Sequence, residues 1–284
     1  MSVGGGEVIR PFRWDVARRS QLGSLTEVAR PETYPQFEAD LLYCCAEVLS
    51  FAGDSDLVFV GRSPQALFDL LSGLLFDTSW RDRLQLLNLS LSEGPPNAEQ
   101  VRRLYPYLAE TGLEPHALMA RERPVAFVDV VARGVTFGRL LDLLKDWSDQ
   151  ESVEWRAVAR KIRIVGLTEY LKTSPNTWRW QQHAEWVERL RPQKIVNVSV
   201  TWPLREYLGI APKTSDSFTA IRWGDEDVTR PDRGVEAQQA LALAVHLFDL
   251  GSIKAWRHAF ARALTQQPAM KERWLRSLIL ELKH

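Results

Sequence analysis

The sequence has few of the residues on which metal, disulfide and redox functions depend. Only two cysteines and five histidines occur among the 284 residues. Because neighbouring cysteines rarely form a relaxed disulfide, we expect Cys44 and Cys45 to be two buried thiols in a reducing, cytoplasmic protein. The histidines are scattered and show no HExxH-like spacing, so we do not expect protein side chains alone to bind a metal ion.

Long apolar runs and an excess of one charge are also missing. No uninterrupted apolar stretch approaches the ~18 residues of a membrane-spanning helix, and residues 1–14 lack the apolar core of a signal peptide. We therefore expect neither membrane insertion nor export. Lys and Arg together number 36, as do Asp and Glu. This balance gives no global attraction to nucleic acid, which is not expected as a partner, although it leaves local basic patches open.

Apolar residues make up 45% of the chain, and their spacing alternates between strand-like and helix-like periods. Helix-like stretches separate short, β-branched-rich runs typical of buried parallel strands. This alternation predicts an α/β fold with a parallel sheet covered by helices on both faces. The predicted strands comprise residues 57–60, 84–90, 125–131, 162–167 and 194–202. The main predicted helices comprise residues 34–51, 65–76, 137–147 and the tryptophan-rich segment 176–190.

The composition changes along the chain and suggests three parts. Residues 1–33 are punctuated by glycine, arginine and proline and are expected to wrap around the domain. Residues 34–233 carry the α/β pattern, within which residues 217–223 predict an edge strand or a hairpin arm. Residues 234–284 are helical throughout and predict a C-terminal helical appendage. These last helices either cover the core or dock a partner, and the sequence leaves the oligomeric state open, a homo-oligomer included.

Two predicted strands lead into loops with specialised residues, at the sheet edge where α/β proteins bind ligands. The first loop contains Gly61, Arg62 and Ser63, and Pro64 suits the first helical position after a Ser63 N-cap. It provides a basic side chain and a hydroxyl group at the start of a helix. The alternative interpretation is a capped helix start with a surface arginine.

In the second loop, Asp129 ends an apolar strand just before a tight turn. Amide groups in such a turn, at a helix N-terminus, form a common phosphate site. Gly134 can adopt a positive φ and admit a ligand to the backbone, while Thr136 can cap the helix and contact a phosphate oxygen. Asp129 can accept hydrogen bonds from sugar hydroxyls, so the loop predicts a site for ribose 5-phosphate. The alternative is an ordinary strand-to-helix turn with a capping threonine. The turn consists of Ala132, Arg133, Gly134, Val135 and Thr136.

Residues 127–138, FVDVVARGVTFG, resemble the phosphoribosyl-diphosphate loop of the type I phosphoribosyltransferases. That family's signature is an apolar strand, two acids, two aliphatics, any residue, Thr or Ser, Gly, any residue, and Thr or Ser. Val128 replaces the first acid and Arg133 replaces the first hydroxyl residue. The first loop resembles the family's pyrophosphate loop, and the resemblance covers roughly residues 40–205. The matching positions are Asp129, Val130, Val131, Gly134 and Thr136.

The resemblance implies a phosphoribosyltransferase-like protein whose partner is a small sugar phosphate or a nucleotide. Asp129 would be the catalytic acid that contacts ribose, residues 132–136 would bind the phosphate, and residues 61–63 would bind pyrophosphate. Mg²⁺ would enter with the diphosphate, and phosphoribose would pass to a nitrogenous base. Residues 97–123 predict helices broken at Gly112 and Pro115, where family members carry a flexible flap. The alternative is a non-catalytic protein of the same fold that senses a nucleotide or serves as an interaction module.

Overall fold

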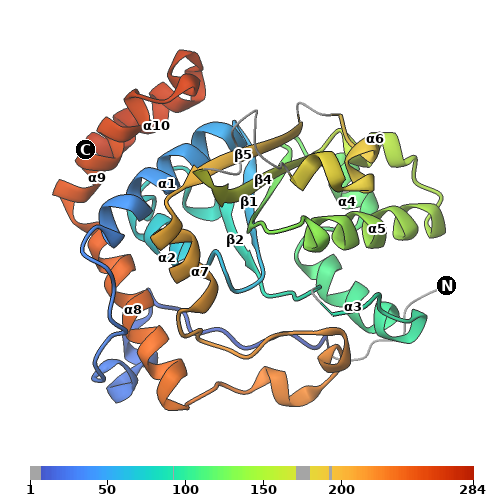
Figure 1. Cartoon of the computed structure of the whole chain (residues 1–284), viewed down its shortest axis with the longest axis horizontal. Coiled ribbons are helices and arrows are strands. Elements are labelled where there is room, and N and C mark those ends of the chain that lie inside the picture. The colour runs from blue at the N-terminus through green and yellow to red at the C-terminus, as the bar shows by residue number, and fades with distance from the viewer. Residues whose placement is uncertain (1–7, 92, 171–179, 192–193) are drawn as a thin grey trace.

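A five-stranded sheet lies at the centre of the computed structural model, which describes residues 8–91, 93–170, 180–191 and 194–284 (Figure 1). All neighbouring strands are parallel, in the order β2-β1-β3-β4-β5. The predicted α/β class with a parallel sheet is therefore confirmed, whereas the closer likeness to one family stays a prediction. The strands are β1 (Asp56–Val60), β2 (Leu84–Leu87), β3 (Val125–Val130), β4 (Ile162–Glu169) and β5 (Ile195–Val200).

Helices cover both faces of this sheet, because alternate strand residues point to opposite sides. In β1, Leu57 and Phe59 belong to one buried cluster, and Val58 and Val60 belong to the other. Each buried side chain of this size contributes roughly 1.5–3 kcal/mol. The first cluster is covered by α1 (Phe37–Ala52), α2 (Gln65–Leu74), α7 (Trp202–Ile210), α8 (Val235–Ser252), α9 (Lys254–Thr265) and α10 (Arg273–Lys283). The second is covered by α3 (Ala98–Glu110), α4 (Pro115–Ala120), α5 (Val135–Gln150) and α6 (Trp155–Ala159).

Helices α2 and α8 touch through two glycines. A Cβ atom on Gly73 would lie 2.0 Å from the Phe248 carbonyl oxygen, and one on Gly251 would lie 2.6 Å from the Leu70 carbonyl oxygen. The two backbones therefore approach more closely than any side chain would allow. The chain before α1 also contacts these helices, since Arg13 pairs with the buried Asp69 of α2. The predicted division of the chain into three parts stays a prediction.

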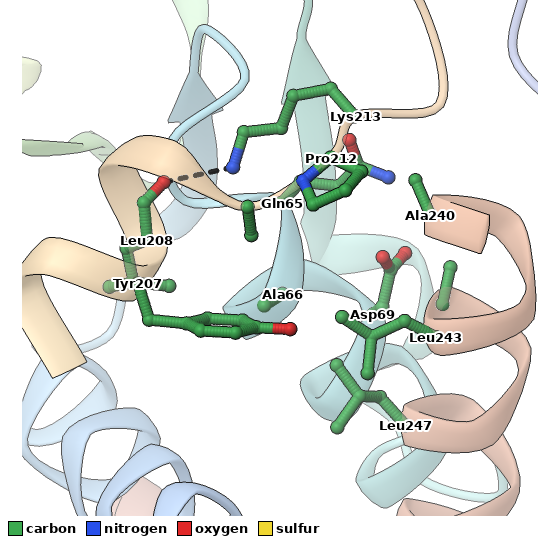
Figure 2. Close-up of a pocket in the computed structure, with 12 residues that line it drawn as sticks. Gln65, Ala66, Asp69, Tyr207, Leu208, Pro212, Lys213, Ala240, Leu243 and Leu247 are labelled. Atoms are coloured by element: carbon green, nitrogen blue, oxygen red, sulfur yellow. Dashed lines mark hydrogen bonds between the residues drawn. The ribbon is translucent and has the colours of Figure 1, made fainter. Parts of the chain in front are cut away.

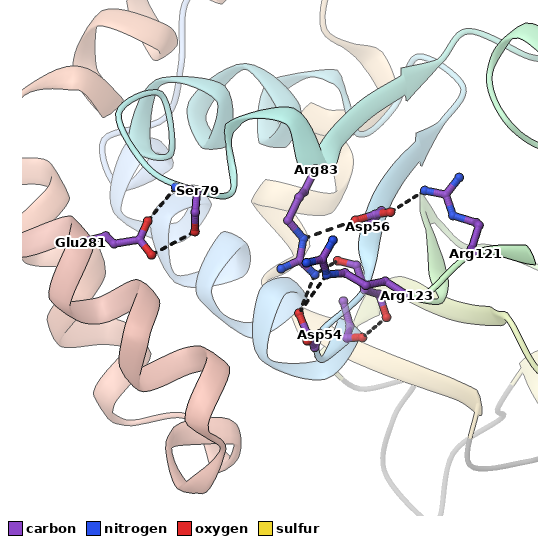
Figure 3. A network of polar contacts seen from close by, with 9 residues as sticks. Asp54, Asp56, Ser79, Arg83, Arg121, Arg123 and Glu281 are labelled. Atoms are coloured by element: carbon purple, nitrogen blue, oxygen red, sulfur yellow. Dashed lines mark hydrogen bonds and ion pairs between the residues drawn. The ribbon is translucent and has the colours of Figure 1, made fainter.

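Ion pairs fix the start of β1 at the amino edge of the sheet (Figure 3). Arg83 donates to Asp54 Oδ1 at 2.7 Å and to Asp56 Oδ1 at 3.3 Å. Arg121, just after α4, donates to the other Asp56 oxygen. The side chains of Arg83 and Asp56 are largely shielded from solvent, so these pairs are less screened than surface pairs. They join β1 to the segment before β2 and to α4.

Three local predictions differ from the structure. Residues 217–223 form no strand, and their centre is a 3-10 helix, Ala220–Arg222, because Trp223 Nε1 bonds back to the Phe218 carbonyl oxygen. Strand β2 stops at Leu87 instead of residue 90, where the chain bonds to the 218 region. In the tryptophan-rich segment, the described part forms two 3-10 helices, Trp180–His183 and Glu185–Arg189, while residues 176–179 lie outside the described residues.

Other local predictions are confirmed. Residues 97–123 form two helices, α3 and α4, and the chain between them turns at Gly112, whose φ is 73°. Pro115 is the first residue of α4, where its missing N–H costs nothing. Cys44 and Cys45 are both buried free thiols on α1. Within the described ranges, no helix has the combination of length and apolar character that crossing a bilayer requires.

Candidate functional site

A cavity of about 260 Å³ lies at the carboxyl ends of β1, β2 and β3. The chain leaves β1 for α2 on one face of the sheet and leaves β3 for α5 on the other face. The cavity therefore lies at the topological switch point, where open α/β sheets bind their ligands. Both loops singled out in the sequence contribute to its wall. The polar lining residues include Arg62, Ser63, Asn88, Asp129, Thr136 and Lys213.

The loop after β1 presents a cation to this cavity. Gly61 has a φ of 76°, and its N–H donates to the Leu87 carbonyl oxygen at 2.8 Å, which turns the chain sharply. Arg62 follows, half-buried, and its Nη1 donates to the Ser215 carbonyl oxygen at 3.1 Å. Burial lowers the pKa of Arg62, but guanidinium stays charged in proteins. One N–H group of the guanidinium is thus bound to the backbone, and further N–H groups remain for a ligand.

The predicted N-cap role of Ser63 is wrong. Helix α2 begins at Gln65, and Pro64 occupies its N-cap position without any side-chain hydrogen bond to the helix. The Gln65 N–H instead bonds to the Arg62 carbonyl oxygen, so the turn extends one residue further than expected. Ser63 lines the cavity. Ser63 therefore borders the cavity instead of capping the helix.

Asp129 ends β3 in a buried position, with 8% of its surface exposed. Its Oδ1 accepts a hydrogen bond from the Val130 N–H at 2.7 Å. Burial raises the pKa of Asp129 to about 8, and the hydrogen bond offsets this only in part. At neutral pH the group is mostly a carboxylic acid, which both donates and accepts hydrogen bonds. It can therefore face a sugar hydroxyl or a phosphate oxygen without repelling either.

The loop after β3 contacts the cavity less than the sequence predicts. Of its turn, only Thr136 lines the wall, whereas Ala132, Arg133 and Val135 are solvent-exposed and outside the lining. Helix α5 begins at Val135 with Gly134 at its N-cap, so the predicted capping role of Thr136 is also wrong. The shift arises because the glycine, and not a hydroxyl side chain, supplies the turn conformation at the helix start.

Two tryptophans occupy the backbone surface that was expected to admit a ligand. Gly134 has the predicted positive φ, 75°, but a Cβ there would lie 2.5 Å from the Trp180 ring. Trp186 Nε1 donates to the Gly134 carbonyl oxygen at 3.0 Å, and Trp180 Nε1 donates to Asn197 Oδ1 at 2.9 Å. The close approach that Gly134 permits is thus made by aromatic side chains. Sequence reasoning missed this, because the two tryptophans were assigned to a regular helix.

Lys213 and Asn88 are lining residues that the sequence did not single out. Lys213 Nζ donates to the Leu208 carbonyl oxygen at the end of α7, at 2.9 Å (Figure 2). Burial, reinforced by the charge of Arg62, lowers the pKa of Lys213 to about 8. Asn88 Nδ2 donates to Ser215 Oγ at 2.9 Å, and its Oδ1 is buried with no partner among the described residues. The position of Asn88 directly after β2 is a signal that strand-end reasoning could have used.

A second, much smaller cavity lies between α2, α7 and α8 (Figure 2). Its volume of about 20 Å³ is that of about one water molecule, so it cannot hold a larger ligand. Asp69 lines it, and Gln65 Nε2 donates to Thr214 Oγ1 beside it at 3.0 Å. The Asp69 carboxyl group favours the charged form of Lys213 and opposes part of the effect of burial on its pKa. This region therefore supports the lysine of the main cavity.

The lining residues fit a phosphate group better than a magnesium diphosphate. Asp129 is the single carboxyl group in the wall and is mostly protonated, whereas Arg62 and Lys213 are cationic. A divalent cation prefers several charged oxygen ligands, and two neighbouring cations oppose it. Among the described residues, no three His, Cys, Asp or Glu side chains are grouped to hold a metal ion.

Compared with models of protein families, with curated proteins and with solved structures, the chain matches none of them. The chemistry of the cavity must therefore be inferred from its own residues.

Proposed function

We propose that this protein binds a phosphorylated sugar, such as a pentose 5-phosphate or the ribose-phosphate part of a nucleotide. One observation carries the proposal: two loops far apart in the sequence line one cavity, in which cations lie beside hydroxyl and carboxyl groups. Arg62 and Lys213 supply the positive charge, and Ser63 adds a hydroxyl donor. Guanidinium and ammonium groups in a partly buried wall bind phosphate oxygens through charge-assisted hydrogen bonds.

The remaining lining groups suit the sugar. Asp129 and Thr136 line the cavity and can exchange hydrogen bonds with ribose hydroxyls. Asn88 also lines it and adds a polar side chain to the same wall. The volume of about 260 Å³ is slightly below the roughly 300–1,000 Å³ of drug-sized ligand pockets. The size supports a sugar phosphate more than a complete nucleotide.

The chemistry favours binding without turnover. The single buried acid and the two cations do not fit a metal-bound diphosphate, and Val128 replaces one acid of the family signature. A sensing or interaction protein would use the bound sugar phosphate as a signal. Phosphoribosyl transfer is the second candidate, favoured by the order of the two loops along the chain. In that reaction Arg62 and Lys213 would stabilise negative charge on the departing diphosphate.

Isothermal titration calorimetry with ribose 5-phosphate tests binding, and Arg62→Gln is the informative variant. Removing a hydrogen bond to a charged group costs roughly 1.5–3 kcal/mol, so affinity should fall about 10- to 100-fold. Arg133→Gln is the matched control, because it removes the same charge from an exposed position outside the cavity. The affinity of Arg133→Gln for ribose 5-phosphate should equal that of the unaltered protein. No heat at millimolar ligand, or equal losses in both variants, would contradict the proposal.

Turnover is tested separately. Phosphoribosyl diphosphate, Mg²⁺ and a panel of nitrogenous bases are supplied, and pyrophosphate release is measured. We expect no release and no gain in ribose 5-phosphate affinity on adding Mg²⁺. Release that Arg62→Gln abolishes and Arg133→Gln preserves would establish the transferase instead.

A further inference from the structure

Another hollow, with a volume of about 860 Å³, lies near the opposite edge of the sheet. Its residues come from α6, from the 3-10 helix Glu185–Arg189 and from the chain just before β5. They precede β4 and β5, whereas the sugar-phosphate cavity follows β1, β2 and β3, so the two sites lie at opposite ends of parallel strands. We call this hollow the basic groove, after its five cationic lining residues: Arg156, Arg160, Arg189, Arg191 and Lys194.

The positive charge of the basic groove is largely uncompensated. Among the described lining residues, Glu188 is the only acidic one, and Arg189 is paired with Asp142. The other four cations have no ion pair within the part of the chain that the structure describes. The stretches outside it nearest in sequence, residues 171–179 and 192–193, contain no Asp or Glu. An excess of cations therefore gathers here on a chain whose net charge is zero.

Lys194 lies among these cations, and its pKa reflects their positive charge. Its Nζ donates to the Arg160 carbonyl oxygen at 3.1 Å, which holds the ammonium group beside α6. Burial lowers the pKa of Lys194, and the positive charges of Arg163, Arg191 and Lys161 lower it further. Like charges placed so close together repel one another and destabilise the folded chain. A polyanion would relieve that repulsion.

The lining indicates which polyanion fits. Four of the five cations are arginines, whose planar guanidinium groups bind phosphates through paired hydrogen bonds. Among the described lining residues, Ala159 and Leu190 are the apolar ones, and all the others are charged. Charged residues are depleted at the centre of protein–protein interfaces. No aromatic side chain is among the described lining residues, so these residues offer no surface on which bases could stack. These features favour contacts with phosphates alone.

We propose that the basic groove binds single-stranded nucleic acid through its phosphates and without preference for sequence. Phosphate contacts supply affinity but read no bases. A flexible single strand can bring its phosphates into a hollow of this kind, whereas a duplex is a stiff rod with a convex surface. The proposal is independent of the sugar-phosphate cavity, since the two sites share no residue.

Fluorescence anisotropy with a labelled oligo-dT strand, titrated at several salt concentrations, tests the proposal. Three or four phosphate contacts predict a slope of log affinity against log salt of roughly −2 to −3. The variant Arg156→Gln/Arg160→Gln removes two exposed cations, one from α6 and one from the position directly after it. It should weaken binding about tenfold at low salt and reduce the slope by roughly 1.4. An oligo-dA strand should bind with similar affinity.

The matched control is Arg262→Gln/Arg273→Gln, which removes two exposed arginines from α9 and α10. We expect the control to bind oligo-dT as the unaltered protein does, and circular dichroism to be the same for all three proteins. Equal weakening in both variants would overturn the proposal, because overall charge would then explain binding. Binding absent at high micromolar protein would also overturn it. Tighter binding of a duplex, or equal binding of polyglutamate, would assign the groove to another partner.

Discussion

The loops after β1 and β3 begin alike and serve different purposes. Each follows a buried strand, turns at a glycine with positive φ and leads into a helix of the sandwich. After β1, Arg62 and Ser63 face the cavity. After β3, Gly134 lies beneath Trp180 and Trp186, and most of the turn is solvent-exposed outside the cavity. A loop that resembles a binding motif can thus be used chiefly for packing, while its plainer neighbour supplies the charge.

The substitution Gly134→Ala tests this difference between the two loops most directly. The new methyl group would meet the Trp180 ring, and an L-residue at φ 75° is strained, whatever the surroundings. The left-handed conformation costs roughly 1–2 kcal/mol and overpacking roughly 1–3 kcal/mol, so we expect a loss of about 2–5 kcal/mol in urea denaturation. Gly94→Ala is the control, because a Cβ there meets nothing within 4 Å. If Gly134→Ala lost no more stability than Gly94→Ala, the tryptophans would not restrain the loop.

Asp129→Asn should raise the stability of the protein, whereas Gly134→Ala should lower it. Its folded-state pKa of about 8 lies above the ordinary 3.8, so ionisation costs stability progressively as pH rises between these values. The amide keeps the acceptor for the Val130 N–H and cannot ionise. At a pH of about 9 we expect the variant to be more stable by about 5–6 kcal/mol, because each unit of the pKa difference corresponds to about 1.4 kcal/mol. Near pH 4 thermal denaturation should find the two proteins alike, and a constant difference at all pH values would contradict the burial argument.

Trp186→Phe gives the smallest expected effect. It removes the hydrogen bond to the Gly134 carbonyl oxygen but retains an aromatic ring in the cluster. We expect a loss of about 1–2 kcal/mol in chemical denaturation, from the lost hydrogen bond and the smaller ring. Affinity for ribose 5-phosphate should be unchanged, since Trp186 does not line the cavity. A large fall in affinity at normal stability would mean that the packed loop does take part in binding.

The sequence predicted the features that depend on local pattern. Apolar periodicity was enough to place the five strands, and the rule that ligands bind at strand ends led to Gly61, Arg62 and Asp129. It could not place Lys213, which enters the cavity from a loop after α7. Nor could it foresee Trp180 over Gly134, since a glycine with positive φ is compatible with a ligand or a side chain. Contacts between distant segments decide such cases.

The distribution of charge over the surface also depends on contacts between distant segments. A chain with equal numbers of acidic and basic residues gave no reason to expect a polyanion as partner. The basic groove arises because α6 and the chain before β5 fold together, although the lining arginines fall in separate stretches of sequence. Net charge averages over the whole surface, whereas a ligand meets only a part of it.

The glycine contact between α2 and α8 constrains the order in which the chain can mature. Helix α2 begins shortly after Arg62, yet its partner residues, Phe248 and Gly251, are synthesised long after it. On the ribosome, the side of α2 that faces these residues therefore stays uncovered until α8 has been made. A nascent chain that stops before α8 should be unable to complete this contact.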